Sequence, residues 1–313
     1  MNKPESADAV PASLKKGPAA VAKRTVAALA TAAAVVALFL YAPVMAFPPA
    51  LALCAVLCQA EFCGMAKRKT PAVSAARGCA AVLLSYMLMP VVLAASPEAG
   101  PLVPVFAAPA AVAALLLALA AFKPGTVRAA LVESAGLAYI CIPVSFFMLL
   151  AVPDSCCCAD PRYGVQLLFF VLAATKASDM GGYAFGKAFG RRKLCPSISP
   201  NKTWEGLFGG MSGSALVACI FCACAGNMRG AADACHPLFW DWLTYPRAAL
   251  AGVALCLLGT AGDLFESKIK RVCGVKDSSV HLPAGMGGFL DMFDSIMFAP
   301  AAFYAFCALN GLL

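Results

Sequence analysis

Charged residues are scarce in this sequence. They make up 13% of its 313 residues, whereas hydrophobic residues make up 62%, far from the usage of soluble globular proteins. Runs without any charge recur, each near or above the ~18 residues that a membrane-spanning helix requires. They cover residues 25–60, 78–96, 99–122, 134–153, 206–228 and 295–313. This composition excludes a soluble core and predicts a polytopic membrane protein.

The sequence also lacks the basic stripe that binds nucleic acid. It has 24 lysines and arginines against 16 acidic residues, a formal net charge of +8, but the basic residues are scattered between the apolar runs. This scatter argues against a nucleic-acid partner. If the N-terminus is cytoplasmic, 20 of the 24 fall in the N-terminal tail and alternate loops. The positive-inside rule therefore predicts a cytoplasmic N-terminus and a C-terminus on the opposite side.

Cysteine is plentiful, with 16 residues, but the pattern of a metal site is missing. Most of these cysteines lie inside apolar runs, where a buried thiol behaves as a small hydrophobe. The run Cys156, Cys157 and Cys158 has no histidine nearby and lacks the usual ligand spacing. We assign no role to it.

The apolar runs predict an all-α fold of about nine transmembrane helices. The expected ranges are 25–46, 48–66, 79–96, 101–122, 131–152, 164–190, 204–227, 247–266 and 290–311. Pro48 and Pro49 divide the first long run, because proline lacks a backbone donor and cannot continue a helix. We expect a polar, basic cytoplasmic tail at residues 1–24 and a single transmembrane domain at residues 25–313. Its two long polar loops, 191–203 and 267–289, are the expected catalytic loops at the cytoplasmic face.

The sixth expected helix carries ionisable residues, which are costly at membrane depth and indicate function by default. Lys176 and Asp179 are three residues apart and Tyr183 lies four further on, so all three share one face. They form either a self-satisfied ion pair or part of a site, and the sequence leaves both open. Glycines at four-residue spacing predict close packing of this helix against the next: Gly182, Gly186 and Gly190, then Gly206 and Gly210.

The loop before the seventh helix offers donors for an anion. Ser199, Asn201, Lys202 and Thr203 supply hydroxyl, amide and ammonium groups just before a helix N-terminus, where free backbone N–H groups favour negative charge. A phosphate fits this arrangement. The alternative is an ordinary capped helix start with Glu205 in its first turn.

The segment of residues 262–295 is the strongest candidate site. Asp263, Glu266, Ser267 and Lys270 share one face at the end of the eighth helix, and Asp291, Asp294 and Ser295 share one at the start of the ninth. Such hard oxygen ligands suit Mg²⁺, which takes one or two carboxylates plus substrate phosphates and water. The neighbouring groups suited to a polyphosphate are Lys268, Lys270, Arg271, Lys276, Gly285, Gly287 and Gly288. The alternative is a basic loop with helix-capping acids.

This segment resembles the phosphatidate cytidylyltransferases, also called CDP-diacylglycerol synthases, an integral membrane family. The matching residues are Gly262, Asp263, Glu266, Ser267, Lys270, Arg271, Lys276, Asp277, Pro283, Gly287, Gly288, Asp291 and Asp294. The stretches SPNKTWEG at residues 199–206 and ASDMGGYAFGKAFG at residues 177–190 are similar to two more family segments. The sequence departs from the family at Met286 and Met292, where the family commonly has histidine and arginine.

The resemblance implies transfer of the cytidylyl group of CTP to phosphatidic acid, with Mg²⁺ as cofactor and pyrophosphate as product. It implies Asp263, Asp291 and Asp294 as metal ligands, and the same three with Lys270 and Arg271 as the catalytic set. The implied substrate-binding residues are Ser199, Asn201, Lys202, Thr203, Ser267, Lys276, Asp277, Gly287, Gly288 and Asp179. The expected location is the bacterial inner membrane, among membrane lipids, and a homodimer is left open.

Two other functions are alternatives at this point. A related membrane enzyme uses CTP to phosphorylate a polyprenol-like alcohol and leaves CDP in place of pyrophosphate. A secondary transporter also places charged residues near broken helices. Against a transporter, the charged groups cluster at one face and no inverted repeat is visible.

Overall fold

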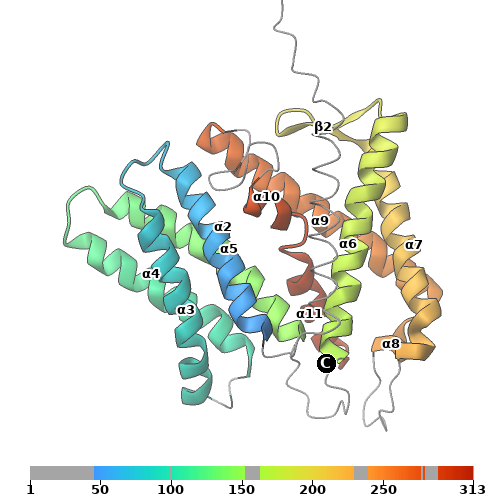
Figure 1. Cartoon of the computed structure of the whole chain (residues 1–313), viewed down its shortest axis with the longest axis horizontal. Helices are drawn as coiled ribbons and strands as arrows, with labels where there is room; N and C mark the ends of the chain where they lie inside the picture. The colour runs from blue at the N-terminus through green and yellow to red at the C-terminus, as the bar shows by residue number, and fades with distance from the viewer. Residues whose placement is uncertain are drawn as a thin grey trace, which may run out of the picture. The chain divides into compact units, whose positions relative to one another are not determined.

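The computed structural model describes residues 46–96, 98, 100–151, 163–228, 239–275, 278 and 288–312. All of them lie in one compact unit, Pro43–Leu313. The first expected helix, residues 25–46, and the tail before it fall almost wholly outside the described residues. The described elements are helical apart from one short hairpin (Figure 1).

The helices on the N-terminal side of this unit follow the expected ranges closely. They are α2 (Phe47–Ala66), α3 (Ala75–Ala95), α4 (Leu102–Ala121) and α5 (Val127–Ala151). Proline occupies the first turn of α2, where its missing N–H leaves no helical bond unmade. Ser74 begins α3 by accepting a hydrogen bond from the Arg77 amide at 3.4 Å, which satisfies one of the free donors of the first turn.

The remaining elements build the region of the candidate site. They are α6 (Tyr163–Phe189), β1 (Lys193–Cys195), β2 (Ser199–Thr203), α7 (Trp204–Met228), α8 (Phe239–Trp242), α9 (Tyr245–Cys273), α10 (Phe289–Phe293) and α11 (Ala299–Leu309). The loop expected at residues 191–203 is thus an antiparallel hairpin, with Lys193 paired to Thr203.

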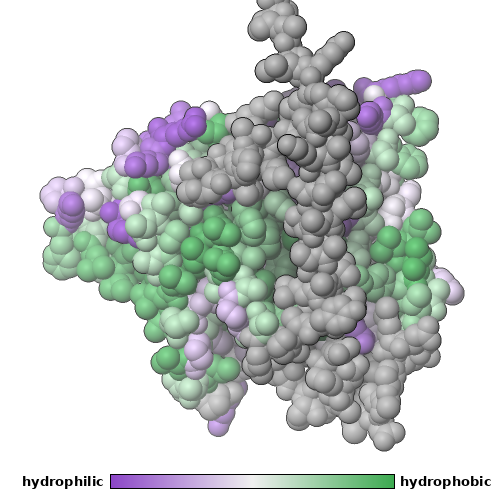
Figure 2. All heavy atoms as spheres, viewed as in Figure 1, coloured by the Kyte–Doolittle hydropathy of each residue, from purple (hydrophilic) through white to green (hydrophobic). Residues whose placement is uncertain are grey.

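Six of the described helices are long and apolar enough to cross a membrane: α2, α3, α4, α5, α7 from Trp204 to Ala225, and α9. In the view of Figure 2, hydrophobic residues cover much of the flank formed by α2 to α5, and strongly hydrophilic residues gather toward the edge where the β1–β2 hairpin lies. A multi-pass, all-α membrane fold is therefore confirmed at this level.

Glycines let α6 and α7 approach closely, as their spacing predicts. A Cβ added at Gly181 would lie 2.5 Å from the carbonyl oxygen of Gly209, and one at Gly206 would lie 2.9 Å from that of Gly182. Side chains larger than hydrogen would push the backbones apart. This packing fixes the hairpin, which joins the two helices, next to the end of α6.

Two expected boundaries differ from the structure. Helix α9 does not end at residue 266 but continues to Cys273, where Gly274 adopts a left-handed φ of 73° and its amide bonds back to Arg271. The ninth expected helix, residues 290–311, is divided into α10 and α11 by a non-helical segment. The first difference places Ser267 and Lys270 on helix α9, and the second leaves Asp294 and Ser295 in the turn after α10.

Candidate active site

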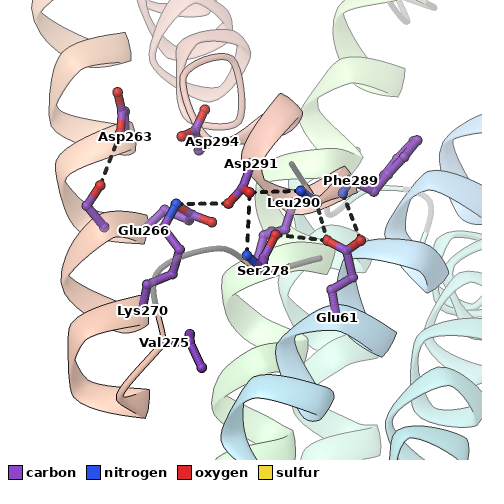
Figure 3. Close-up of polar contacts among 12 residues, drawn as sticks. Glu61, Asp263, Glu266, Lys270, Val275, Ser278, Phe289, Leu290, Asp291 and Asp294 are labelled. Carbon is purple, nitrogen blue, oxygen red and sulfur yellow. Dashed lines mark hydrogen bonds and ion pairs between the residues drawn. The ribbon is translucent and has the colours of Figure 1, made fainter. Parts of the chain in front are cut away.

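Helices α9 and α10 meet through an ammonium group between two carboxylates. The Nζ of Lys270 lies 2.8 Å from Oδ1 of Asp291 and also contacts Oε2 of Glu266. Because α9 continues past residue 266, Glu266 and Lys270 are one turn apart on the same face. Figure 3 shows the ammonium group of Lys270 beside the carboxylates of both Glu266 and Asp291. The polar faces of α9 and α10 therefore meet at Lys270.

Asp291 is held as a charged group. The Gly288 amide donates to its Oδ2 at 2.8 Å and the Ser278 amide at 3.4 Å. Asp291 lies in the short α10, outside the six apolar spans. Burial disfavours its charge, but hydrogen bonding to Glu266, the Gly288 amide and Lys270 outweighs burial and lowers its pKa to about 2.

A second ion pair joins the hairpin to α9. Nζ of Lys202 lies 2.7 Å from Oδ2 of Asp263 and 3.4 Å from the carbonyl oxygen of Thr260. The Ser267 hydroxyl donates to Oδ1 of Asp263 at 3.3 Å. The structure thus brings Lys202, from one expected catalytic loop, to the carboxylate that precedes the other.

Asp294 lies in the turn after α10, close to Asp263. A Cβ added at Gly262 would be 2.5 Å from the carbonyl oxygen of Asp294, so the turn rests directly on α9. The side chain is buried and accepts a hydrogen bond from the Ser295 amide at 2.5 Å. Burial, followed by the nearby charge of Asp263, raises the pKa of Asp294 to about 7.

The donor chemistry of Asp263 and Asp294 fits a divalent cation. Two carboxylates repel each other in a partly buried place, and a cation between them would remove that cost. Mg²⁺ commonly takes only one or two protein carboxylates. Within the part of the chain that the structure describes, no three acidic, histidine or cysteine side chains form a metal-binding group. Asp291, with Asp263 one of the two leading predicted ligands, is ion-paired with Lys270, as Asp263 is with Lys202, and it stays a predicted ligand.

Helix α6 reaches the same turn through the predicted face. Lys176 Nζ lies 3.1 Å from Oδ2 of Asp179. It also donates to Oγ of Ser295 at 3.0 Å and to the carbonyl oxygen of Met292 at 3.3 Å. The Ser295 hydroxyl donates to Asp179 at 2.8 Å. The pair is therefore an ion pair that also contacts the site, while Tyr183 is 71% exposed.

Three further residues, Thr203, Glu205 and Arg271, have structural partners. The buried Thr203 hydroxyl accepts from the Gly206 amide at 3.1 Å, and Glu205 accepts from the amides of Arg191 and Arg192. Arg271 donates to the carbonyl oxygens of Ile198 and Val275, each at 3.3 Å. Thr203 thus caps α7, as the alternative interpretation of this loop holds.

Several predicted residues have no such partner or fall outside the structure. Ser199 pairs with Cys195 in the hairpin, and the Asn201 side chain is exposed; both stay predictions as substrate contacts. Lys276, Asp277 and Gly287 lie outside the described residues, as does Met286.

Glu61 in α2 was not among the residues predicted from the sequence. Its side chain is 1% exposed and accepts hydrogen bonds from the Phe289 amide, the Leu290 amide and the Ser278 hydroxyl. A signal was present, because a carboxylate inside an apolar helix indicates a special role. Its partners, however, lie more than 200 residues further along the chain.

The apolar spans and the carboxylate–lysine site at α9, α10 and the hairpin define a class: a multi-pass α-helical membrane protein with a partly buried polar site. The chain belongs to the cytidylyltransferase family, whose model matches residues 22–310. The match extends the resemblance to the N-terminal half, in which the sequence alone offered only apolar helices.

Curated relatives match over part of this chain. A phosphatidate cytidylyltransferase of Haemophilus influenzae is 40% identical over 147 residues, 47% of each chain. One of Bacillus subtilis is 38% identical over 148 residues, 47% of this chain and 49% of its own. The uncharacterized protein YnbB of Escherichia coli is 41% identical over 142 residues, 45% of this chain and 42% of its own. The chain thus spans about half the length of the curated relatives it matches.

Proposed function

We propose that this protein transfers the cytidylyl group of CTP to phosphatidic acid, giving CDP-diacylglycerol and pyrophosphate. Family membership and the names of its relatives support the proposal. The observation that carries it is that two lysine–carboxylate ion pairs lie along one side of α9: Lys202–Asp263 and Lys270–Asp291. Alternating ammonium and carboxylate groups suit a substrate whose phosphates are neutralised by both lysines and a cation.

The reaction requires positioning more than covalent chemistry. A phosphate oxygen of phosphatidic acid forms a bond to the α-phosphorus of CTP, and the bond from that phosphorus to the bridging oxygen breaks, so that pyrophosphate leaves with the electron pair. In this mechanism Lys202 and Lys270 bind phosphate oxygens, and the contact of Lys270 with Asp291 orients the ammonium group. The chain need not supply a nucleophile of its own.

Asp263, Asp291 and Asp294 are the proposed holders of Mg²⁺. When bound, the ion neutralises phosphate charge and polarises the phosphoryl group. Lys176 and Asp179 secure the turn that carries Asp294, through Ser295 and the Met292 carbonyl. The carboxylates are thereby kept in place from both α6 and α9.

The proposed location is a bacterial inner membrane with the site at the cytoplasmic face. The positive-inside distribution supports a cytoplasmic N-terminus, and CTP is soluble whereas the phosphatidic acid headgroup lies at the membrane surface. The hairpin and the C-terminal end of α9 then face the same aqueous side.

Product analysis with the purified protein tests this function. With CTP, phosphatidic acid and Mg²⁺, we expect stoichiometric pyrophosphate and CDP-diacylglycerol. Asp291→Asn should lower the rate by about 100-fold or more, because it removes the charge that holds Lys270. Met292→Leu, one residue further along α10, should keep activity. Release of CDP instead of pyrophosphate would identify a lipid kinase and reject the proposal.

A further inference from the structure

Glu61 is a buried carboxylate that joins α2 to the start of α10. Its Oε1 accepts from the Phe289 amide at 2.8 Å. Its Oε2 accepts from the Leu290 amide at 2.8 Å and from the Ser278 hydroxyl at 3.1 Å. In Figure 3, Ser278 and Leu290 lie between Glu61 on one side and Lys270 on the other. Three hydrogen bonds thus satisfy a charge that would otherwise be costly to bury.

Helix α10 depends on such an outside contact. It has five residues, too few to be stable on propensity alone, and the first amides of any helix have no partner within it. Glu61 supplies the acceptor for two of those amides. The fit is close, because a Cβ added at Gly288 would lie 2.5 Å from Oε2 of Glu61.

The same short segments are bonded to Asp291 on their other side. The amides of Ser278 and Gly288 donate to Oδ2 of Asp291. The Ser278 hydroxyl and the amides of Phe289 and Leu290 donate to Glu61. A change at Glu61 therefore reaches Asp291 through backbone that both carboxylates share. Asp291 in turn holds the ammonium group of Lys270.

We propose that Glu61 is a positioning residue, which fixes the start of α10 so that Asp291 meets Lys270 in the orientation that the reaction needs. It acts through the Ser278, Phe289 and Leu290 donors and does not itself contact substrate. Its effect on turnover rests on the proposed function, whereas its hold on α10 does not.

The test compares Glu61→Gln with Glu133→Gln. Glutamine keeps the shape of Glu61 but has only one acceptor oxygen for three donors. Glu133 is a matched control, because it is also fully buried and also accepts from a backbone amide, that of Ser74 at 2.7 Å, and from Arg77. Its carboxylate has no described bond to the residues around α10.

Amide hydrogen exchange gives a readout that needs no activity. In Glu61→Gln, the peptide containing Phe289 and Leu290 should exchange roughly tenfold faster or more, as expected when a hydrogen bond to a charged acceptor is lost. The same peptide should be unchanged in Glu133→Gln. Unchanged exchange in Glu61→Gln would overturn the proposal.

The Mg²⁺ dependence of the rate gives a second readout. Loss of folded protein lowers the maximal rate but leaves the half-saturating Mg²⁺ concentration unchanged. We expect Glu61→Gln to raise that concentration by about 10- to 100-fold, as for other residues that orient metal-site ligands, and Glu133→Gln to leave it unchanged. Faster exchange without this rise would refute the positioning role.

A milder variant covers the case in which Glu61→Gln does not fold. Ser278→Ala removes one donor to Glu61 and should raise both the exchange rate of this peptide and the half-saturating Mg²⁺ concentration by about threefold. If neither changes, the proposal is overturned. If the wild-type protein releases no pyrophosphate, the proposed function fails by itself. The exchange comparison then decides whether Glu61 holds α10.

Discussion

The packing of α6 on α7 leads to a paired prediction at two adjacent glycines. A Cβ at Gly181 would lie 2.5 Å from the carbonyl oxygen of Gly209, but one at Gly182 would meet the Gly206 oxygen at 3.5 Å, an ordinary contact. Alanine at Gly181 must therefore displace one backbone by roughly 1 Å, whereas alanine at Gly182 needs no displacement.

The two variants share every effect except this clash. Both gain about 1 kcal/mol of helix propensity, so their difference isolates the overpacking, for which about 1–3 kcal/mol is expected. Gly181→Ala should also lower the rate, by up to about 100-fold, because α6 and α7 carry Asp179 and the hairpin with Lys202, and displacements of this size misplace reacting groups.

Thermal unfolding in detergent and pyrophosphate release measure the two effects. Gly182→Ala should unfold at or above the unfolding temperature of the wild type and keep the wild-type rate. Gly181→Ala should unfold at a lower temperature than the wild type and release pyrophosphate more slowly. Equal stability of the two variants would refute the reasoning from backbone contact. If both variants lost activity but kept full stability, the segment of α6 around Gly181 and Gly182 would instead be in direct contact with substrate.

Three further predictions concern charges at the site. Lys202→Met removes the ion pair with Asp263 and one proposed phosphate contact, so the KM for CTP should rise by about 10-fold or more in steady-state kinetics. Lys176→Met removes the bonds of the lysine to Ser295 and to the Met292 carbonyl and leaves only the Asp179–Ser295 bond. It should lower kcat/KM by about 10-fold, with a smaller loss of stability because the pair is half-exposed. Chelation of divalent cations should stop pyrophosphate release, and Mg²⁺ added in excess should restore it.

Local periodicity is the reason that much of the site could be predicted from the sequence. The positions of Asp263 and Lys270 on one face of a helix follow from a spacing of 3.6 residues per turn. Lys176 and Asp179 follow from the same rule, and their ion pair is confirmed at 3.1 Å. The glycine spacing likewise predicted the close packing of α6 on α7, because backbone approach depends on residue size alone.

Contacts between distant segments could not be predicted in this way. The three donors to Glu61 come 217 to 229 residues later in the chain, and no periodic pattern connects them with α2. Charge was also a misleading guide to helix ends. Polar residues after residue 266 suggested a loop, but amphipathic side chains continue a helix readily, and the left-handed Gly274 is what ends α9.

The break between α10 and α11 explains how Asp294 comes to lie beside Asp263. A continuous helix over residues 290–311 would satisfy its own carbonyl groups and stay at helix-packing distance from α9. In the broken form, the backbone carbonyls of Asp294 and Ser295 press against α9 at Gly262 and Gly259, where an added Cβ would lie 2.5 and 2.9 Å away. Irregular backbone is tolerated in a membrane protein only where protein or a polar cavity surrounds it. The two glycines provide that close cover, so the irregular turn brings the Asp294 carboxylate near enough to Asp263 for the two charges to interact.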